Sequence, residues 1–134
     1  MTPVVLPPCP SAPHCVCSVQ DSQDSHYIAP LRVGEKMASD NSKTEAAKVL
    51  AKLVQILRSE FSGSVTVVSQ SETSVKVEFR SSIFGFVDDG LFAFNAEAGT
   101  IEMRSASRVG YWDLGANRRR LERLRTAWDA AQSL

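Results

Sequence analysis

The sequence has no long hydrophobic run. Its apolar stretches are only a few residues long, whereas a membrane-spanning helix needs about 20. The N-terminus, MTPVVLPPCP, lacks the basic and hydrophobic regions of a secretory signal, and it is not an arginine-rich transit peptide either. We therefore expect no transmembrane segment, and either a cytoplasmic protein or one whose targeting segment is missing from this chain.

The chain also carries no net charge. The 134 residues contain 15 Lys and Arg and 15 Asp and Glu. Because nucleic-acid-binding domains usually carry a net positive charge, we expect no nucleic-acid partner. The charges are nevertheless distributed in blocks: residues 60–103 hold seven acidic and two basic groups, and residues 104–125 hold seven of the ten arginines. An acidic block followed by a basic one predicts ion pairs within the protein.

The common catalytic motifs are absent as well. The chain contains no G-x-S-x-G, no H-E-x-x-H, no P-loop and no G-x-G-x-x-G. It has only two histidines, and a pairing of Cys15 with His26 would rest on proximity in a segment without a predicted conformation. The sequence therefore favours a non-enzymatic protein, and we expect no cofactor.

Three cysteines are present, Cys9, Cys15 and Cys17, with His14 among them. Structural zinc sites usually take two pairs of ligands, and no second pair follows along the chain, so we expect no metal. Cys9 and Cys15 are the disulfide candidates in an oxidising compartment. In a reducing cytosol all three cysteines would be free thiols.

A chain of this length forms one compact domain. Residues 1–35 are rich in Pro, Ser and Asp and show no helical period, which predicts an extended arm, whereas residues 36–134 are predicted to form a single α+β domain. The capping box SKTE at Ser42, followed by apolar residues at helical spacing, predicts a helix that ends at Gly63.

Period-two alternation then predicts four strands, which begin near Val65 and cover about 75–80, 90–95 and 100–107. Asp113 is the expected N-cap of a last helix. The predicted fold class is α+β: a four-stranded antiparallel meander with two helices packed on one face and an extended N-terminal arm. The residues expected to be buried are Leu53, Leu57, Val77, Phe79, Leu121 and Trp128.

The run Arg118–Arg120 does not form a basic face. Successive helical residues are 100° apart, so Arg119 and Arg123 are predicted to point to solvent, while Arg118 and Arg120 lie on opposite flanks. A helix that reads a nucleic-acid groove would gather its basic groups on one side. Arg118 is the member of the run that leans toward the sheet.

Asn117 lies on the inward stripe of the same helix. An unpaired amide there costs about 1–3 kcal/mol, so Asn117 must bond to a structural partner or line a polar pocket. On the fourth strand, Ser105 and Ser107 alternate with arginines and share the face of Met103, toward the helices. Arg104 is expected on the opposite face.

Asp88 and Asp89 interrupt the apolar stretch FGFVDDG. Because adjacent residues of an extended chain point to opposite faces, they should have different partners. One could meet an arginine and the other could cap a turn at Gly90. We expect at least one ion pair between this acidic block, together with Asp113, and the arginines Arg104, Arg108 and Arg118.

Four segments, CPSAPHCVCS, HYIAPL, FGFVDD and RSASRVGYWDLGANRRRLERLR, follow one another in an order that resembles the family catalogued as domain of unknown function 1499. The resemblance covers about residues 9–125. It implies no activity, since the family has none established. Its members occur in bacteria and photosynthetic eukaryotes, some with signal or plastid-targeting segments, so a mature plastid or periplasmic form is also expected. The chain departs from the family's pattern at His14, Cys17, Trp112, Gly90 and Leu91.

Two functions follow from these observations. The first is an interaction or accessory protein that docks onto a larger assembly through its N-terminal arm and polar sheet face. The second is a domain that binds a small anion, a carboxylate or phosphate. The residues of that charge network or ligand site are Arg104, Ser105, Ser107, Arg108, Asp113, Asn117, Arg118, Asp88 and Asp89.

Overall fold

Four long strands form an antiparallel meander, as predicted. The computed structural model describes residues 6–34, 42–81, 85–108 and 113–132. The meander strands are β3 (Val65–Gln70), β4 (Ser74–Arg80), β5 (Val87–Asn95) and β6 (Thr100–Ser107). Gly99 closes the β5–β6 hairpin with φ 66°, and its amide donates to Asn95 O. Glycine adopts this left-handed conformation without steric cost.

The N-terminal segment is not a separate arm, which corrects the four-strand prediction. It contributes β1 (Cys15–Cys17) and β2 (Leu31–Arg32), and both pair antiparallel with β6, so the sheet has six strands. Strands of two and three residues show too little alternation to be recognised in the sequence. The predicted boundary between arm and domain, at residues 35 and 36, lies outside the described residues.

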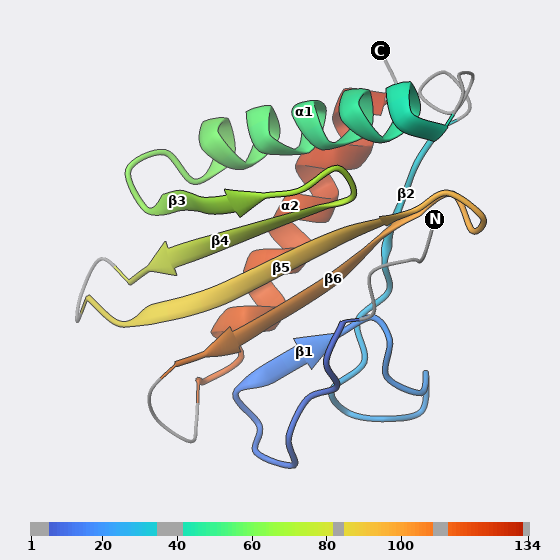
Figure 1. Ribbon diagram of the computed structural model, residues 1–134. Coiled ribbons are helices and arrows are strands. Elements are labelled where there is room, and N and C mark those ends of the chain that lie inside the picture. Colours follow the sequence, from blue (N-terminus) through green and yellow to red (C-terminus); the bar gives the residue numbers. More distant parts are fainter. Residues whose placement is uncertain (1–5, 35–41, 82–84, 109–112, 133–134) are drawn as a thin grey trace.

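The two helices pack on one face of the sheet (Figure 1). α1 (Ser42–Glu60) contacts β3, β4 and β5, whereas α2 (Ala116–Gln132) contacts β6, β1 and β2. α1 begins where the capping box predicts, although the side chain of Ser42 lies outside what the structure describes. All six residues expected in the core are buried: Leu53, Leu57, Val77, Phe79, Leu121 and Trp128.

The third long strand begins at Val87, three residues earlier than predicted, so that Asp88 and Asp89 belong to β5. Gly90 therefore lies inside the strand, and the turn that one of the two aspartates was expected to cap at Gly90 does not exist. A Cβ at Gly90 would come within 2.7 Å of the Phe79 ring and 2.8 Å of a Val77 methyl group. The glycine allows these two core side chains of β4 to pack directly over the backbone of β5.

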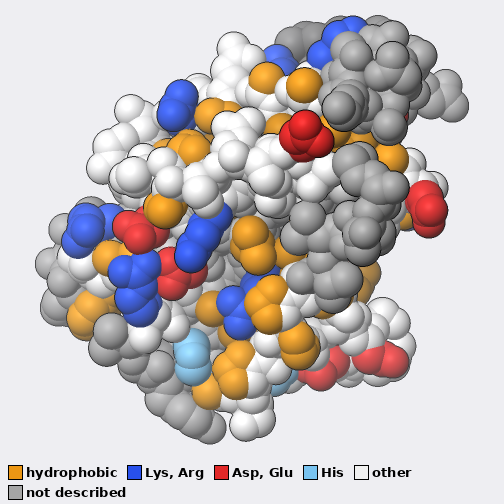
Figure 2. Space-filling model, in the orientation of Figure 1, with side chains coloured by type: hydrophobic (Ala, Val, Ile, Leu, Met, Phe, Trp, Pro, Cys, Tyr) orange, Lys and Arg blue, Asp and Glu red, His pale blue; other side chains and the backbone are white. Residues whose placement is uncertain are grey.

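We call the face of the sheet that points away from the helices the outer face. Its described side chains come from alternate residues of β4, β5 and β6: Lys76, Glu78, Arg80, Asp89, Leu91, Ala93, Glu102, Arg104 and Ala106. Leu6 is buried against this face, where it packs with Cys17 and Ala93. Figure 2 shows basic and acidic side chains side by side near the end of β4, with hydrophobic side chains next to them.

Candidate functional site

Asn117 is the centre of a buried polar network on the helix side of the sheet. Its Oδ1 accepts from Ser105 Oγ at 2.6 Å and from Arg120 Nη1 at 3.2 Å. Its Nδ2 donates to Ser107 Oγ at 2.9 Å and to His14 O at 3.1 Å. The amide of Asn117 thus joins α2, β6 and the N-terminal segment, and burying it carries no cost of an unsatisfied polar group.

Asp113 completes this network and caps α2. Its Oδ1 accepts from the Gly115 amide at 2.8 Å, and its Oδ2 accepts from the side chain of Asn117 at 2.7 Å and from its backbone amide at 3.3 Å. A carboxylate at this position also lies at the positive end of the helix dipole. The structure therefore gives Asp113 the N-cap contacts that the sequence suggests.

The backbone before α2 is unusual. Leu114 has φ 56° and Gly115 has φ 79°, so two successive residues are left-handed, and Leu114 is the rare non-glycine example. The Leu114 side chain is 73% exposed. Such strain persists only where neighbouring contacts fix the backbone, and here Asp113 supplies them by accepting the Gly115 amide.

Arg120 and Asp88 form the most buried ion pair among the described residues. Arg120 Nη1 lies 2.9 Å from Asp88 Oδ2, and the side chains are only 15% and 10% exposed. The guanidinium of Arg120 also stacks over the Phe79 ring, 4.7 Å from its centroid. The sequence placed Arg120 on a flank of the helix without a partner, so this pair was missed.

Arg108 pairs with Asp89, one of the combinations expected from the sequence. Arg108 Nη2 and Nε bond to the two carboxylate oxygens at 2.6 and 3.2 Å, and Nη2 also reaches Glu78 at 2.9 Å. The hydrogen bond to Asp89 and then the one to Glu78 raise the pKa of Arg108 above its usual value. Because the Arg108 side chain is half exposed, water screens this network.

The other arginines of the last helix bind different elements. Arg118 donates to Ser25 O, Arg119 donates to Leu114 O, and Arg125 donates to the carbonyls of Ala29 and Pro30. Arg123 is exposed, as predicted, but it is not free: it pairs with Glu60 at 2.8 Å and stacks on the Phe61 ring. The cluster therefore fastens α2 to its surroundings in several directions.

Arg104 is the exception in the cluster. It lies on the outer face, between Cys17 of β1 and Leu91 of β5 in the strand register. Its Nε is buried and makes no hydrogen bond. The adjacent Glu102 instead accepts from Ser18 Oγ at 2.9 Å and from Thr100 Oγ1. Arg104 thus has a hydrogen-bond donor that the described part of the fold does not use.

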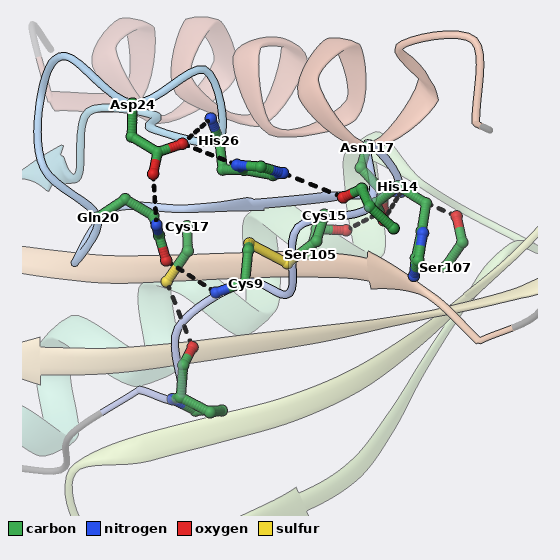
Figure 3. The surroundings of a disulfide bond; sticks show 12 residues. Cys9, His14, Cys15, Cys17, Gln20, Asp24, His26, Ser105, Ser107 and Asn117 are labelled. Carbon is green, nitrogen blue, oxygen red and sulfur yellow. Dashed lines mark hydrogen bonds and ion pairs between the residues drawn. A yellow bond between two sulfur atoms is a disulfide. The ribbon is translucent and has the colours of Figure 1, made fainter. Parts of the chain in front are cut away.

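A hollow of about 200 Å³ lies between the N-terminal segment and the start of α2. Cys9 and Cys15 form a disulfide there, with 5.6 Å between their Cα atoms. Figure 3 shows His26 reaching the segment between these cysteines from one side and Asn117 reaching it from the other. The hollow is lined by Ser11, Pro13, Cys15, Val16, Ser25, His26, Asp113, Gly115 and Arg118.

His26 holds the segment closed by the disulfide. Its Nδ1 lies 2.7 Å from Asp24 Oδ1 and its Nε2 lies 3.0 Å from Ala12 O. The hydrogen bond to Asp24 is the main cause that raises the pKa of His26, and the bonds that Asp24 accepts from His26 lower the pKa of that carboxyl. Because both ring nitrogens face acceptors, the protonated imidazole fits this position best.

Cys17 is the free cysteine, and it is buried on the outer face. Burial raises the pKa of its thiol, which disfavours the reactive thiolate. Among the described residues, no group of three His, Cys, Asp or Glu side chains could hold a metal ion.

The structure separates the residues that the sequence grouped into one site. Asn117, Ser105, Ser107 and Asp113 form the network on the helix side, with the pair of Asp88 and Arg120 beside it. Arg104, Arg108 and Asp89 lie on the outer face, and Arg118 lines the hollow. For β6 the reason is its alternation, which sends Ser105 and Ser107 to one face and Arg104 to the other.

The fold and the site define an α+β protein whose antiparallel sheet is joined to its last helix by a buried polar network. Residues 5–128 match the model of the family described as "Protein of unknown function (DUF1499)", so the chain belongs to that family. No curated protein and no solved structure matches the chain significantly. No helix among the described residues is long and apolar enough to cross a membrane.

Proposed function

We propose that this protein is a non-enzymatic interaction or accessory protein that docks a partner on its outer face. The observation that carries the proposal is the guanidinium of Arg104. Its Nε is buried without a hydrogen bond, on the sheet face opposite the two described helices. A buried donor without a partner costs about 1–3 kcal/mol. A carboxylate of the partner would remove that cost once the Arg104 side chain turns outward to meet it.

The surroundings of Arg104 indicate what kind of partner fits. Arginine binds a carboxylate through two parallel N–H···O bonds, which fixes the orientation of the partner as well as its position. Leu91 lies beside Arg104 in the register and packs at the edge of the small apolar cluster of Leu6, Cys17 and Ala93. We infer a partner protein that places an Asp or Glu on Arg104 and an apolar side chain next to it.

The N-terminal segment takes part in this proposal as a border of the docking face. Leu6 lies on the outer face, and the disulfide ties Cys9 to β1. The described part of the segment is therefore held against the sheet and does not extend away from it.

Partner purification with matched baits tests the proposal. Wild-type protein, Arg104→Gln and Arg80→Gln are each used as bait in an extract of the source cells, and the partner is then purified and its affinity measured. Arg80 lies on the same face but bonds to Gly85 O, so its replacement is the control. We expect Arg104→Gln to weaken binding at least tenfold, or about 1.4 kcal/mol, and Arg80→Gln to leave it nearly unchanged.

Equal affinities for the wild-type protein and Arg104→Gln would contradict the proposal. Glutamine keeps much of the length of the arginine side chain and removes its charge, so the sheet should stay folded. Thermal unfolding of the two variants checks this point. A partner that binds both variants as tightly as wild type docks elsewhere on the molecule.

The alternative function, binding of a small anion by the arginine and serine cluster as a whole, fits the structure less well. Ser105, Ser107 and Asn117 bond to one another, and Arg108 is paired with Asp89. These donors are already used within the fold. An anion site would therefore need the donors at the hollow, where Arg118 is the member of the cluster that remains.

A further inference from the structure

We propose that the hollow beside the Cys9–Cys15 disulfide binds a small carboxylate. This site lies at the junction of the N-terminal segment and α2, apart from the outer face on which the docking proposal rests. Three parts of the chain meet in it: the disulfide loop, the loop that carries Ser25 and His26, and the first turn of α2. The proposal rests on the donors, the charges and the size of the hollow.

The hydrogen-bond donors come from one arginine and two serines. Arg118 donates from Nη2 to Ser25 O at 2.8 Å, and its Nε and Nη1 have no acceptor among the described residues. Ser11 and Ser25 also line the hollow, and each carries a hydroxyl group that can donate a hydrogen bond. A guanidinium with two unused N–H directions and adjacent hydroxyls is a common arrangement for a carboxylate.

The backbone amides at the start of α2 do not bind the ligand in this proposal. The carboxylate of Asp113 already accepts the amides of Gly115 and Asn117, so these amides are not offered to a ligand. The ligand would instead contact the side chain of Arg118, the third residue of α2. The hollow therefore differs from the anion sites that bare helix N-termini form.

The charges around the hollow favour a single negative charge. Arg118 and the protonated His26 supply two positive charges, whereas Asp113 and Asp24, which binds His26, supply two negative ones. Because the charges of the site cancel, no net positive charge offsets the cost of taking the ligand out of water, and this cost is larger for a dianion than for a monoanion. A carboxylate is therefore favoured over a phosphate.

The size and the lining of the hollow indicate what the uncharged part of the ligand is. A volume of about 200 Å³ corresponds to roughly six or seven water molecules in the liquid, which suits a ligand of a few carbon atoms. Pro13 and Val16 line the hollow together with the disulfide at Cys15, and these groups are apolar. We therefore infer a short-chain carboxylate whose charged end contacts Arg118 and whose hydrocarbon end contacts this wall.

Titration followed by NMR tests the site. Sodium propionate, sodium phosphate and sodium chloride are added to the oxidised protein at equal ionic strength, and amide shifts are recorded. We expect saturable shifts at Ser11, Ser25 and Gly115 with propionate, with a dissociation constant on the order of millimolar, as befits a ligand of five heavy atoms. Chloride should give only small shifts that do not saturate.

Variants of two neighbouring arginines give the matched comparison. Arg118→Gln should weaken propionate binding at least tenfold, whereas Arg119→Gln, which changes a side chain bonded only to Leu114 O among the described residues, should change it less than twofold. The same spectra show whether each variant is folded. Unsaturable propionate shifts, equal affinity in Arg118→Gln, or saturation by phosphate alone would each overturn the assignment of a carboxylate site.

Discussion

Arg120 of α2 and Asp88 of β5 form a nearly buried ion pair, with Arg120 Nη1 2.9 Å from Asp88 Oδ2. The pair links the last helix to the third strand of the meander, and Arg120 also covers the Phe79 ring. Burying two charges is costly, and the mutual attraction offsets this cost only while both partners are present. The pair therefore makes α2 and β5 dependent on each other.

Removing one partner of this pair should be strongly destabilising. We expect Arg120→Met and Asp88→Leu each to lower the free energy of unfolding by about 3–5 kcal/mol, because the remaining charge is buried without a partner. The double variant should recover most of this loss. Urea titration measures all three, with Arg119→Met as the exposed control, expected within about 0.5 kcal/mol of wild type.

Trp128 should be the most sensitive position of the last helix. Its ring is fully buried, and its Nε1 donates to Arg32 O at 2.7 Å. We expect Trp128→Ala to lower the free energy of unfolding by about 3–5 kcal/mol. Trp128→Phe keeps an aromatic ring and should cost less. A loss below about 1 kcal/mol for the alanine variant would show that α2 is not held by this residue.

Stability should depend on pH through His26. The pKa of His26 is raised in the folded protein, so its contribution is full below its unfolded pKa of about 6.5 and is lost as pH rises through the higher folded pKa. The pKa of Asp24 is lowered, so its contribution is lost only as pH falls through that lower value. The stability difference between wild type and His26→Gln should therefore shrink from pH 5.5 to pH 9 in urea titrations. A stability difference that grows as the pH rises would contradict this prediction.

Breaking the disulfide should loosen the wall of the hollow. The loop from Cys9 to Cys15 has a sequence separation of 6, and closing so short a loop contributes about 2 kcal/mol by chain entropy. We expect Cys9→Ser to lose about this much stability and to bind propionate more weakly. Cys17→Ser keeps the disulfide and serves as the control. Unchanged stability of Cys9→Ser under oxidising conditions would mean that hydrogen bonds alone hold the loop.

Binding to DNA or RNA should be weak at moderate salt. The arginines of the last helix point in several directions, and Arg120 and Arg123 are paired with carboxylates. A nucleic-acid site needs basic groups gathered on one surface. Submicromolar affinity with a steep salt dependence, measured by fluorescence anisotropy, would contradict this expectation.

The sequence predicted the helices and strands whose apolar residues recur at a regular spacing. Period-two and helical spacing located both helices and the meander, and alternation placed Ser105 on the face of Asn117, where a hydrogen bond of 2.6 Å joins them. The start of β5 was placed too late because Asp88 and Asp89 resemble turn residues. Their strand conformation depends on pairing with β4 and β6.

Contacts between distant segments could not be predicted in the same way. β1 and β2 are too short to show a period, and they exist because β6 offers them a partner. A helical wheel gives the direction of Arg120 around its own axis, but it does not reveal that Asp88 lies opposite. The missing hydrogen bond of Arg104 Nε is likewise visible only once the neighbouring strands are in place.

The hydrogen bonds between α2 and the segment around β2 also affect the order in which the protein can fold. Trp128 and Gln132 both donate to Arg32 O, across 96 and 100 residues of sequence. Because synthesis proceeds from the N-terminus, the first strands leave the ribosome long before these donors exist. The segment around Arg32 therefore reaches its final hydrogen bonds only after α2 has been made. A chain without α2 therefore leaves the Arg32 carbonyl without these two donors.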